Sequence, residues 1–335
     1  MACVARWVLA VVGWSLGAAM LAPAAGAAEP DVVRLGWYGA PRVWVAGKAA
    51  GLFDKAMGTK VEWVQFASGA TALTGLAARQ VDIARMGSSP NVAAIARKLP
   101  VETIAVAEVI ATSERLVAKT AVKSVADLKG KRIAYPPGST AHYALMAALK
   151  VNHVPASQVT LLGLAPSEML AAWRRGDIDA AYVWGPFSNS MEEAGGHQLL
   201  TTENLQKDGY FIFNTYVVRK EFAQKYPDTV VKFLRAFEQS IDMYRKDPEG
   251  TVKLVAKHLD QKEDQVRATL GGLYSPPFAE QLAAGKYLGE GGSVAPAMAE
   301  TGRFLADLGE LRTSEIPADF RPAINTSYMK RALAR

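Results

Sequence analysis

Short apolar runs alternate with stretches of helical spacing up to about residue 220. The apolar runs have the length and composition of buried strands, while the stretches between them repeat apolar residues at the helical period. This alternation predicts an α/β fold, a sheet covered by helices, and beyond residue 220 the pattern is helical almost throughout. The predicted strands are 32–38, 60–66, 81–86, 104–107, 115–119, 131–135, 158–164, 178–184 and 216–219, and the predicted helices are 43–51, 69–79, 125–128, 139–150 and 165–175.

Two stretches of the chain resemble each other. Residues 76–90 and 172–186 each end a helix, enter a strand and stop at a turn that contains glycine and proline. Asp82 and Asp179 fall at matching places in the two stretches. The likeness predicts two lobes of similar construction, and two such lobes facing each other form a cleft at the carboxyl ends of their strands.

The first 28 residues have the layout of a secretory signal. Arg6 precedes an apolar run over 7–21, and small residues follow at 24–28. We expect residues 1–28 to be removed on export to the periplasm. The alternative, a permanent membrane anchor, needs about twenty apolar residues flanked by a polar stop.

Cysteine content and charge exclude several classes of function. The single cysteine, Cys3, lies in the predicted signal, so the mature chain has no disulfide, cysteine metal site or cysteine nucleophile. The formal charge of +6 falls to +5 without Arg6, and no run of five basic residues occurs. We therefore expect a monomer that binds a small anion, with no cofactor and no nucleic acid.

Small-residue turns join several predicted strands to helices. They contain Ser68, then Gly87 with Ser88 and Ser89, then Ser139 with Thr140. Free backbone N–H groups and the positive end of the helix dipole gather at such helix starts. One such turn is equally well explained by ordinary N-capping, but three at equivalent strand ends indicate an oxyanion site.

Aromatic residues lie beside these turns. Trp37 and Tyr38 follow the first strand, Tyr143 lies in the first helical turn after Ser139, and Trp184 ends a strand. Each alone is typical of core packing, whereas their shared place at strand ends indicates the wall of a ligand pocket.

His142 is the residue in this region that could suggest catalysis. A hydrolase triad also needs a buried carboxylate and a nucleophile elbow, and the mature chain has no Gly-x-Ser-x-Gly. The remaining histidines are isolated and lack an i, i+4 partner for a metal. We expect neither a catalytic residue nor a metal site.

The order of these motifs closely resembles the periplasmic taurine-binding proteins of ABC transporters, within the wider group of sulfonate and nitrate binders. Gly-Ser-Ser-Pro at 87–90, Ser-Thr-x-His-Tyr at 139–143 and Tyr-Val-Trp at 182–184 are the specific motifs. The likeness is strongest from about 60 to 225.

This resemblance implies a type II periplasmic binding protein, with two lobes joined by two crossing hinge strands near 114–119 and 215–219. The expected ranges are 29–116 with 216–335 for lobe 1 and 117–215 for lobe 2. Such a receptor captures taurine and delivers it to the membrane permease of an ABC importer. The expected ligand-binding residues are Trp37, Tyr38, Ser68, Gly87, Ser88, Ser89, Glu108, Glu114, Ser139, Thr140, His142, Tyr143, Trp184 and Asn214.

One position departs from the family pattern. The resemblance implies an aspartate for the taurine ammonium where this chain has Asn214. An amide accepts a hydrogen bond but carries no charge, so either Glu108 or Glu114 supplies the charge, or the ligand is a sulfonate without an amine.

Three alternatives to a taurine receptor stay open. The ligand can be another alkanesulfonate, isethionate or nitrate. An enzyme on the same two-lobed fold is a different class, although porphobilinogen deaminase needs a cysteine that the mature chain lacks. A binding protein that signals to a membrane sensor would have the same sequence features.

Overall fold

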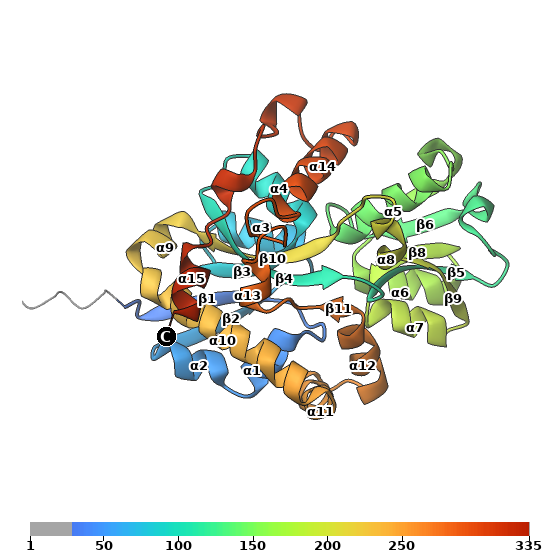
Figure 1. Ribbon diagram of the computed structural model, residues 1–335. Coiled ribbons are helices and arrows are strands. Elements are labelled where there is room, and N and C mark those ends of the chain that lie inside the picture. Colours follow the sequence, from blue (N-terminus) through green and yellow to red (C-terminus); the bar gives the residue numbers. More distant parts are fainter. Residues whose placement is uncertain (1–28, 335) are drawn as a thin grey trace, which may run out of the picture.

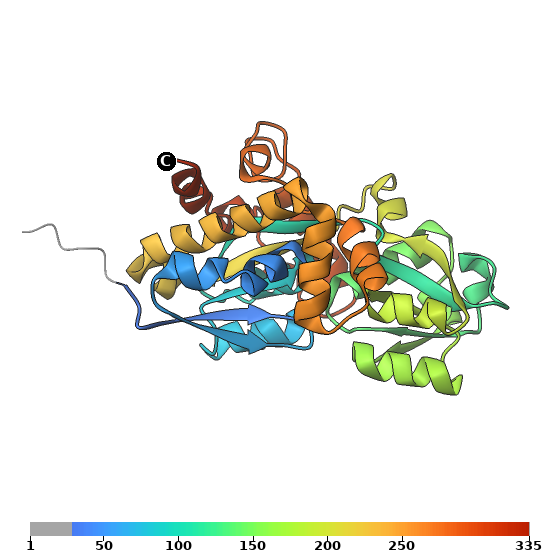
Figure 2. The ribbon, with the colours of Figure 1, turned by 90° about the horizontal axis from the view of Figure 1, so that it is seen from below.

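The computed structural model describes residues 29–334, so the predicted signal at 1–28 and Cys3 lie outside the described residues. Figure 1 shows two α/β units side by side, each built around its own sheet, and the turned view in Figure 2 shows the same arrangement. The predicted α/β class with two units is confirmed.

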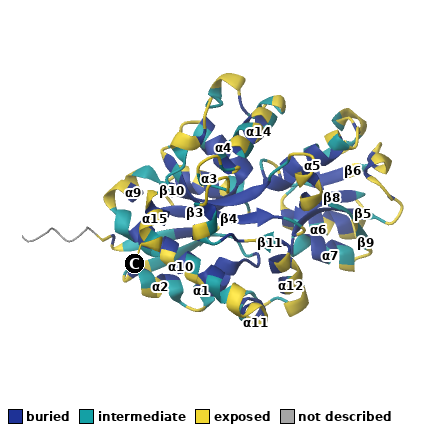
Figure 3. Ribbon diagram, viewed as in Figure 1, coloured by how far each residue is buried: buried dark blue, intermediate teal, exposed yellow. Residues whose placement is uncertain are grey.

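The larger unit contains a six-stranded sheet in the order β11-β4-β10-β3-β1-β2. β1 pairs in parallel with β2 and β3, whereas β10 runs antiparallel between β3 and β4. The three central strands, β4, β10 and β3, are buried over almost their whole length, whereas the edge strands β2 and β11 are partly exposed (Figure 3). Their bounds are β1 (Val32–Trp37), β2 (Lys60–Gln65), β3 (Ile83–Gly87), β4 (Val101–Ile110), β10 (Phe213–Arg219) and β11 (Leu273–Tyr274).

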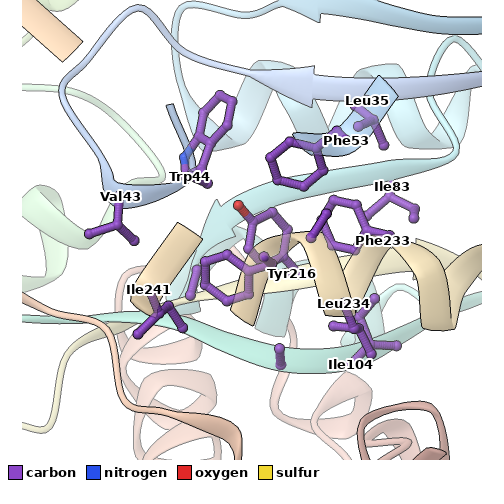
Figure 4. Close-up of a cluster of buried hydrophobic side chains, with 14 of the residues drawn as sticks. Leu35, Val43, Trp44, Phe53, Ile83, Ile104, Tyr216, Phe233, Leu234 and Ile241 are labelled. Atoms are coloured by element: carbon purple, nitrogen blue, oxygen red, sulfur yellow. The ribbon is translucent and has the colours of Figure 1, made fainter. Parts of the chain in front are cut away.

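Helices cover both faces of this sheet. Figure 4 shows one core, in which Trp44, Phe53 and Phe233 pack against Tyr216 of β10. The helices on this face are α1 (Val43–Ala49), α2 (Leu52–Met57), α10 (Pro227–Lys246) and α11 (Pro248–Leu259). The opposite face is covered by α3 (Gly69–Ala77), α4 (Ser88–Ala96) and α14 (Val294–Asp307).

The smaller unit contains a five-stranded sheet in the order β7-β6-β8-β5-β9. One face packs on α5 (Thr140–Val151) and α8 (Thr202–Gln206), and the other on α6 (Pro166–Arg175) and α7 (Phe187–Glu193). Its strands are β5 (Glu114–Lys119), β6 (Arg132–Tyr135), β7 (Thr160–Gly163), β8 (Ala180–Trp184) and β9 (Gly196–Thr201).

The matching aspartates predicted from the internal likeness occupy equivalent places. Asp82 Oδ2 accepts a hydrogen bond of 2.8 Å from the backbone N of Arg34, and Asp179 Oδ2 accepts one of 2.8 Å from the backbone N of Arg132. In both sheets the aspartate that precedes one parallel strand therefore hydrogen-bonds to the backbone near the start of the neighbouring strand, β1 in one sheet and β6 in the other.

The predicted hinge strands each lie within one sheet. β5 pairs with β8 and β9, and β10 pairs with β3 and β4. The hinge positions near 114–119 and 215–219 stay a prediction. The lobe ranges 29–116 with 216–335 and 117–215 stay a prediction.

Most predicted strands and helices lie within a few residues of the observed ones. The sequence reasoning did not assign α2, α7, β9 or α8, and it made β4 too short. The piece at 125–128 is a 3-10 helix. The remaining C-terminal helices are α9 (Lys220–Lys225), α12 (Glu263–Gly271), α13 (Phe278–Gln281) and α15 (Ser327–Leu333).

Candidate ligand-binding site

A small cavity of about 30 Å³ lies between the two units. We call its two sides the large-sheet wall and the small-sheet wall, after the unit that supplies them. The large-sheet wall consists of Tyr38, Arg42, Ser68, Gly69, Arg85, Gly87, Pro90 and Asn214, and the small-sheet wall of Glu114, Ser139, Thr140 and Trp184.

The two walls meet closely where a strand end faces a helix start. Gly87 ends β3, and Thr140 begins α5 on the other unit. A Cβ atom at Gly87 would lie only 2.6 Å from Cγ2 of Thr140. Glycine is therefore required here by the close approach of the two units, and a larger side chain would push them apart.

Arg85 of the large-sheet wall forms a buried ion pair with Glu108. Arg85 Nε donates to both carboxylate oxygens of Glu108, at 3.1 and 2.8 Å, and the side chains are 3% and 0% exposed. The Tyr38 hydroxyl donates to the backbone O of Arg85, which fixes this strand end. Glu108 thus neutralises Arg85 and does not itself line the cavity.

Arg42 is the cation of the cavity that is not fully compensated. It caps the start of α1 and is 4% exposed. Its NH1 donates to the backbone O of Pro41 at 2.6 Å, but its Nε has no hydrogen-bond partner among residues 29–334 and lies 4.0 Å from Glu108. Burial and the repulsion from Arg85 lower the pKa of Arg42 to about 10, as expected for a buried cation that lacks a matched anion.

Glu114 supplies the corresponding anion on the small-sheet wall. It begins β5 and is 3% exposed. Its Oε1 accepts a hydrogen bond of 2.8 Å from Thr140 Oγ1, while its Oε2 has no partner within the described part of the chain. Burial raises the pKa of Glu114 to about 7, against the opposing hydrogen bond from Thr140 and the charges of Arg42 and Arg85.

Of the predicted hydroxyl donors, two are engaged within the protein, whereas Ser88 Oγ and Ser89 Oγ are buried without a partner among the described residues. That any of them binds an anion stays a prediction. Ser139 Oγ donates to the backbone O of Pro136 at 2.6 Å and accepts from the backbone N of His142, so it caps α5. Thr140 Oγ1 donates a hydrogen bond to Glu114 Oε1. Ser88 and Ser89 lie directly behind the wall, between Gly87 and Pro90, and are not among the lining residues.

Only two of the four predicted aromatic residues line the cavity, Tyr38 and Trp184. Trp37 turns into the core, where its ring packs edge-on against Trp44 at 6.0 Å. Tyr143 packs against Phe304 of α14, with ring centroids 4.5 Å apart.

His142 also lies away from the cavity. Its ring stacks on Tyr135 at 4.3 Å, and its Nδ1 is 3.4 Å from a carboxylate oxygen of Glu310. The cavity therefore brings together Tyr38, Ser68, Gly87, Glu114, Ser139, Thr140, Trp184 and Asn214 of the predicted residues, and leaves out Trp37, Ser88, Ser89, Glu108, His142 and Tyr143. That any of them binds a ligand stays a prediction.

Arg42 and Arg85 are the functional candidates that the sequence reasoning missed. Arg85 had a usable signal, since it is a charged residue inside an otherwise apolar strand, as is Glu108 in the next strand. A charge in a buried strand needs a partner, so the two could have been paired. Arg42 precedes a helix and follows Pro41, a position where an arginine is usually solvated.

Neither a metal site nor a membrane span is found in the part of the chain that the structure describes. No three His, Cys, Asp or Glu residues gather there in a way that could hold a metal ion. Among the helices of residues 29–334, none is both long enough and apolar enough to cross a bilayer.

Two α/β units on separate sheets, with a cavity between them, define the type II periplasmic binding protein fold. The family model described as "NMT1/THI5 like" matches residues 43–251. The chain belongs to this family.

Several known proteins are similar to this chain. The taurine-binding periplasmic protein of Escherichia coli (strain K12) is 33% identical over 295 residues, which cover 86% of this chain and 87% of that protein. A putative aliphatic sulfonates-binding protein of Bacillus subtilis (strain 168) is 27% identical, over 69% of this chain and 71% of its own length. The solved structure of the alkanesulfonate-binding protein SsuA from Xanthomonas axonopodis pv. citri, bound to MOPS, is 25% identical with a TM-score of 0.75, and covers 89% of this chain and 99% of its own.

Proposed function

We propose that the protein is a periplasmic receptor that captures taurine and delivers it to an ABC importer. The observation that carries this proposal is that the cavity lining holds buried cationic and anionic atoms without a hydrogen-bond partner among the described residues. Arg85 Nη2 is one of them, although it lies 2.8 Å from Glu108 Oε2 in an ion pair. Arg42 Nε on the large-sheet wall and Glu114 Oε2 on the small-sheet wall are both buried and without a partner among the described residues. A small molecule with an anionic end and a cationic end would satisfy both groups.

The anionic end fits a sulfonate. A sulfonate is fully ionised and spreads one charge over three oxygens, so it can accept from Arg42 and from free backbone N–H groups at the starts of α3 and α5. The cap residues of these two helices, Ser68 and Ser139, line the cavity.

The cationic end fits Glu114. Of the two acidic candidates, Glu108 has both oxygens engaged by Arg85, whereas Glu114 keeps one oxygen free. We therefore assign to Glu114 the charge that Asn214 does not supply. Trp184 and Tyr38 would enclose the carbon chain between the charged ends.

The family and the named relatives support the receptor role and the periplasmic location. Relatives named as taurine- and sulfonate-binding proteins favour binding over catalysis. His142, which sequence reasoning weighed as a catalytic base, packs against Tyr135 outside the cavity lining. Delivery to a permease follows from this class of receptor.

One calorimetric series on the purified mature protein tests the proposal. Taurine is titrated beside isethionate, methanesulfonate, a longer alkanesulfonate and nitrate, at pH 8 in a buffer without a sulfonate group. Sulfonate buffers must be avoided because a related structure holds MOPS. We expect taurine to bind at least about tenfold more tightly than isethionate, a difference of about 1.4 kcal/mol, because isethionate would leave the Glu114 charge unpaired.

Asn214 favours a second candidate, a receptor for a sulfonate without an amine. Equal or tighter binding of isethionate at pH 8 would support that candidate and contradict taurine. Failure of every sulfonate to bind would contradict the sulfonate receptor altogether.

A further inference from the structure

Glu114 lies at the point where the two units meet, and its position is fixed on three sides. Its backbone O accepts a hydrogen bond of 3.1 Å from Thr202 Oγ1, and its residue pairs with Trp184 across the sheet. Its Oε1 accepts from Thr140 Oγ1 at the start of α5. The remaining oxygen, Oε2, has no partner among residues 29–334, and Glu114 itself lines the cavity.

The charged and titratable groups around this carboxyl come from four elements. Arg42 faces it from the start of α1, Arg85 from β3, Glu108 from β4 and Tyr182 from β8. Arg85 and Glu108 cancel each other as an ion pair. The charge of the cavity therefore depends on Arg42 and Glu114. It is zero when Glu114 is ionised and +1 when Glu114 is protonated.

These two charge states are complementary to two classes of ligand. A neutral cavity with separated charges matches a zwitterion, in which the ammonium donates to Oε2 of Glu114 and the sulfonate accepts from Arg42. A cavity of charge +1 matches a monoanion, because a protonated Glu114 is no longer an uncompensated negative charge and its O–H can donate to an oxygen of the ligand.

We propose that the protonation state of Glu114 selects between zwitterionic and purely anionic sulfonates, an inference that rests on the proposed function of this cavity. Ionised Glu114 admits taurine and disfavours isethionate. Protonated Glu114 admits isethionate, whose hydroxyl oxygen accepts its proton, and disfavours taurine. Burial, which raises the pKa of Glu114 to about 7, places the change of state near neutral pH.

The direction of the pH effect follows from proton linkage. Sulfonates are ionised and an alkylammonium is charged throughout pH 5.5 to 8.5, so only the protein titrates. Below its pKa, Glu114 must lose a proton to bind taurine, so taurine affinity falls by about tenfold per pH unit. Above its pKa, Glu114 must gain a proton to bind isethionate, so isethionate affinity falls with rising pH by the same factor.

Calorimetric titrations of taurine and isethionate at pH 5.5, 6.5, 7.5 and 8.5 test this inference. We expect taurine affinity to rise by about thirtyfold from pH 5.5 to 8.5 and isethionate affinity to fall by about as much. Repeating the pH 6 taurine titration in two sulfonate-free buffers of different ionisation enthalpy counts the protons, and we expect close to one proton released. At pH 8 we expect isethionate binding to take up a proton.

Two variants locate the titrating group. Glu114→Gln is permanently uncharged, so we expect it to bind isethionate with a flat pH profile and to lose the rise in taurine affinity. Glu238→Gln is the matched control, because Glu238 on α10 also has its pKa raised to about 7 by burial but accepts from the backbone N of Phe278 and does not line the cavity. We expect this control to keep the wild-type profile.

The results separate the failure of this inference from failure of the proposed function. Taurine affinity that does not change with pH, with no proton released, would overturn proton selection and leave the taurine receptor intact. A pH dependence that persists in Glu114→Gln would overturn it equally, since the titrating group would then not be Glu114. Absence of binding by either ligand at every pH would contradict the receptor itself. Where Glu114→Gln does not fold, the proton count on the wild-type protein still decides.

Discussion

The two walls of the cavity come from units of similar construction but carry opposite chemistry. In both sheets an aspartate ties parallel strands together, through Asp82 in one and Asp179 in the other. The large-sheet wall nevertheless presents two arginines, and the small-sheet wall presents the carboxyl of Glu114. A repeated scaffold thus holds opposite charges on separate units, and a ligand with two charged ends would connect them.

The walls also differ in how far their charges are compensated within the protein. On the large-sheet wall, Glu108 pairs closely with Arg85 at 2.8 Å, while Arg42 Nε lies 4.0 Å from the same carboxylate and makes no hydrogen bond among the described residues. On the small-sheet wall, Glu114 has only the hydroxyl of Thr140. The difference teaches that the cavity is built around one unmatched cation and one unmatched anion.

The largest expected effect comes from removing the free cation. Arg42→Gln should weaken binding of taurine and of every other sulfonate by about a hundredfold or more, because loss of one partner of a buried charge pair costs about 2–5 kcal/mol. Calorimetry measures the loss. Arg267→Gln, which removes an exposed arginine paired with Glu249, is the control and should leave affinity unchanged. Similar affinities for Arg42→Gln and wild type would contradict the assignment of Arg42 as the cation that binds the anionic end of the ligand.

The next effect concerns the unmatched anion in the absence of ligand. The folded pKa of Glu114, about 7, is above its ordinary value of 4.5, so the protonated form stabilises the fold and that contribution is lost as pH rises from 4.5 through 7. Between pH 5 and 8 the free energy of unfolding should fall by about 2–3 kcal/mol more in wild type than in Glu114→Gln. Urea unfolding at the two pH values measures this difference. Parallel losses in both proteins would mean that Glu114 is compensated.

A smaller effect is expected at the helix start on the small-sheet wall. Ser139→Ala removes the cap of α5 and should lower the free energy of unfolding by about 1 kcal/mol. The Ser139 hydroxyl already donates its hydrogen bond to the backbone O of Pro136. Taurine affinity should therefore change by less than about threefold, or about 0.65 kcal/mol. A large loss of taurine affinity with little loss of stability would show that the Ser139 hydroxyl binds the ligand and contradict its assignment as a helix cap only.

The smallest effect is expected at an aromatic residue that sequence reasoning placed in the pocket. Trp37→Phe should change taurine affinity by less than about twofold, or about 0.4 kcal/mol, because Trp37 packs on Trp44 and does not line the cavity. Titration of this variant beside Trp184→Phe, on the small-sheet wall, measures the contrast. A stronger effect at Trp37 than at Trp184 would contradict the assignment of Trp184, and not Trp37, to the cavity lining.

Local patterns account for much of what could be predicted. Apolar runs at the right lengths placed β1, β2, β3, β6, β7 and β8. Of these, β3 and β8 are buried along almost their whole length and read as continuous hydrophobic segments. Short elements such as α8 and β9 escaped, since their half-exposed residues give no clear period. The small-residue turns correctly marked strand ends at the cavity.

The chemistry of the site was less accessible because it depends on pairing across distant segments. Sequence reasoning could not know that Arg85 would meet Glu108 or that Thr140 would meet Glu114, 26 residues away along the chain. The hydrogen-bond partner of the Ser139 hydroxyl could not be predicted either, because the same sequence is compatible with capping a helix and with binding a ligand. Only the fold decides which partner a polar group finds.

The position of β10 has a consequence for how the protein is made. β3 and β4 do not pair with each other, because β10 lies between them in the sheet. β3 and β4 can therefore be joined in one sheet only after the chain has been synthesised as far as Arg219, the end of β10, and the sheet is complete only after β11. During that interval the smaller unit can fold, and β3 can pair with β1, while β4 remains unpaired. For a chain that is exported, this delay prolongs the unfolded state in which a translocation channel accepts it.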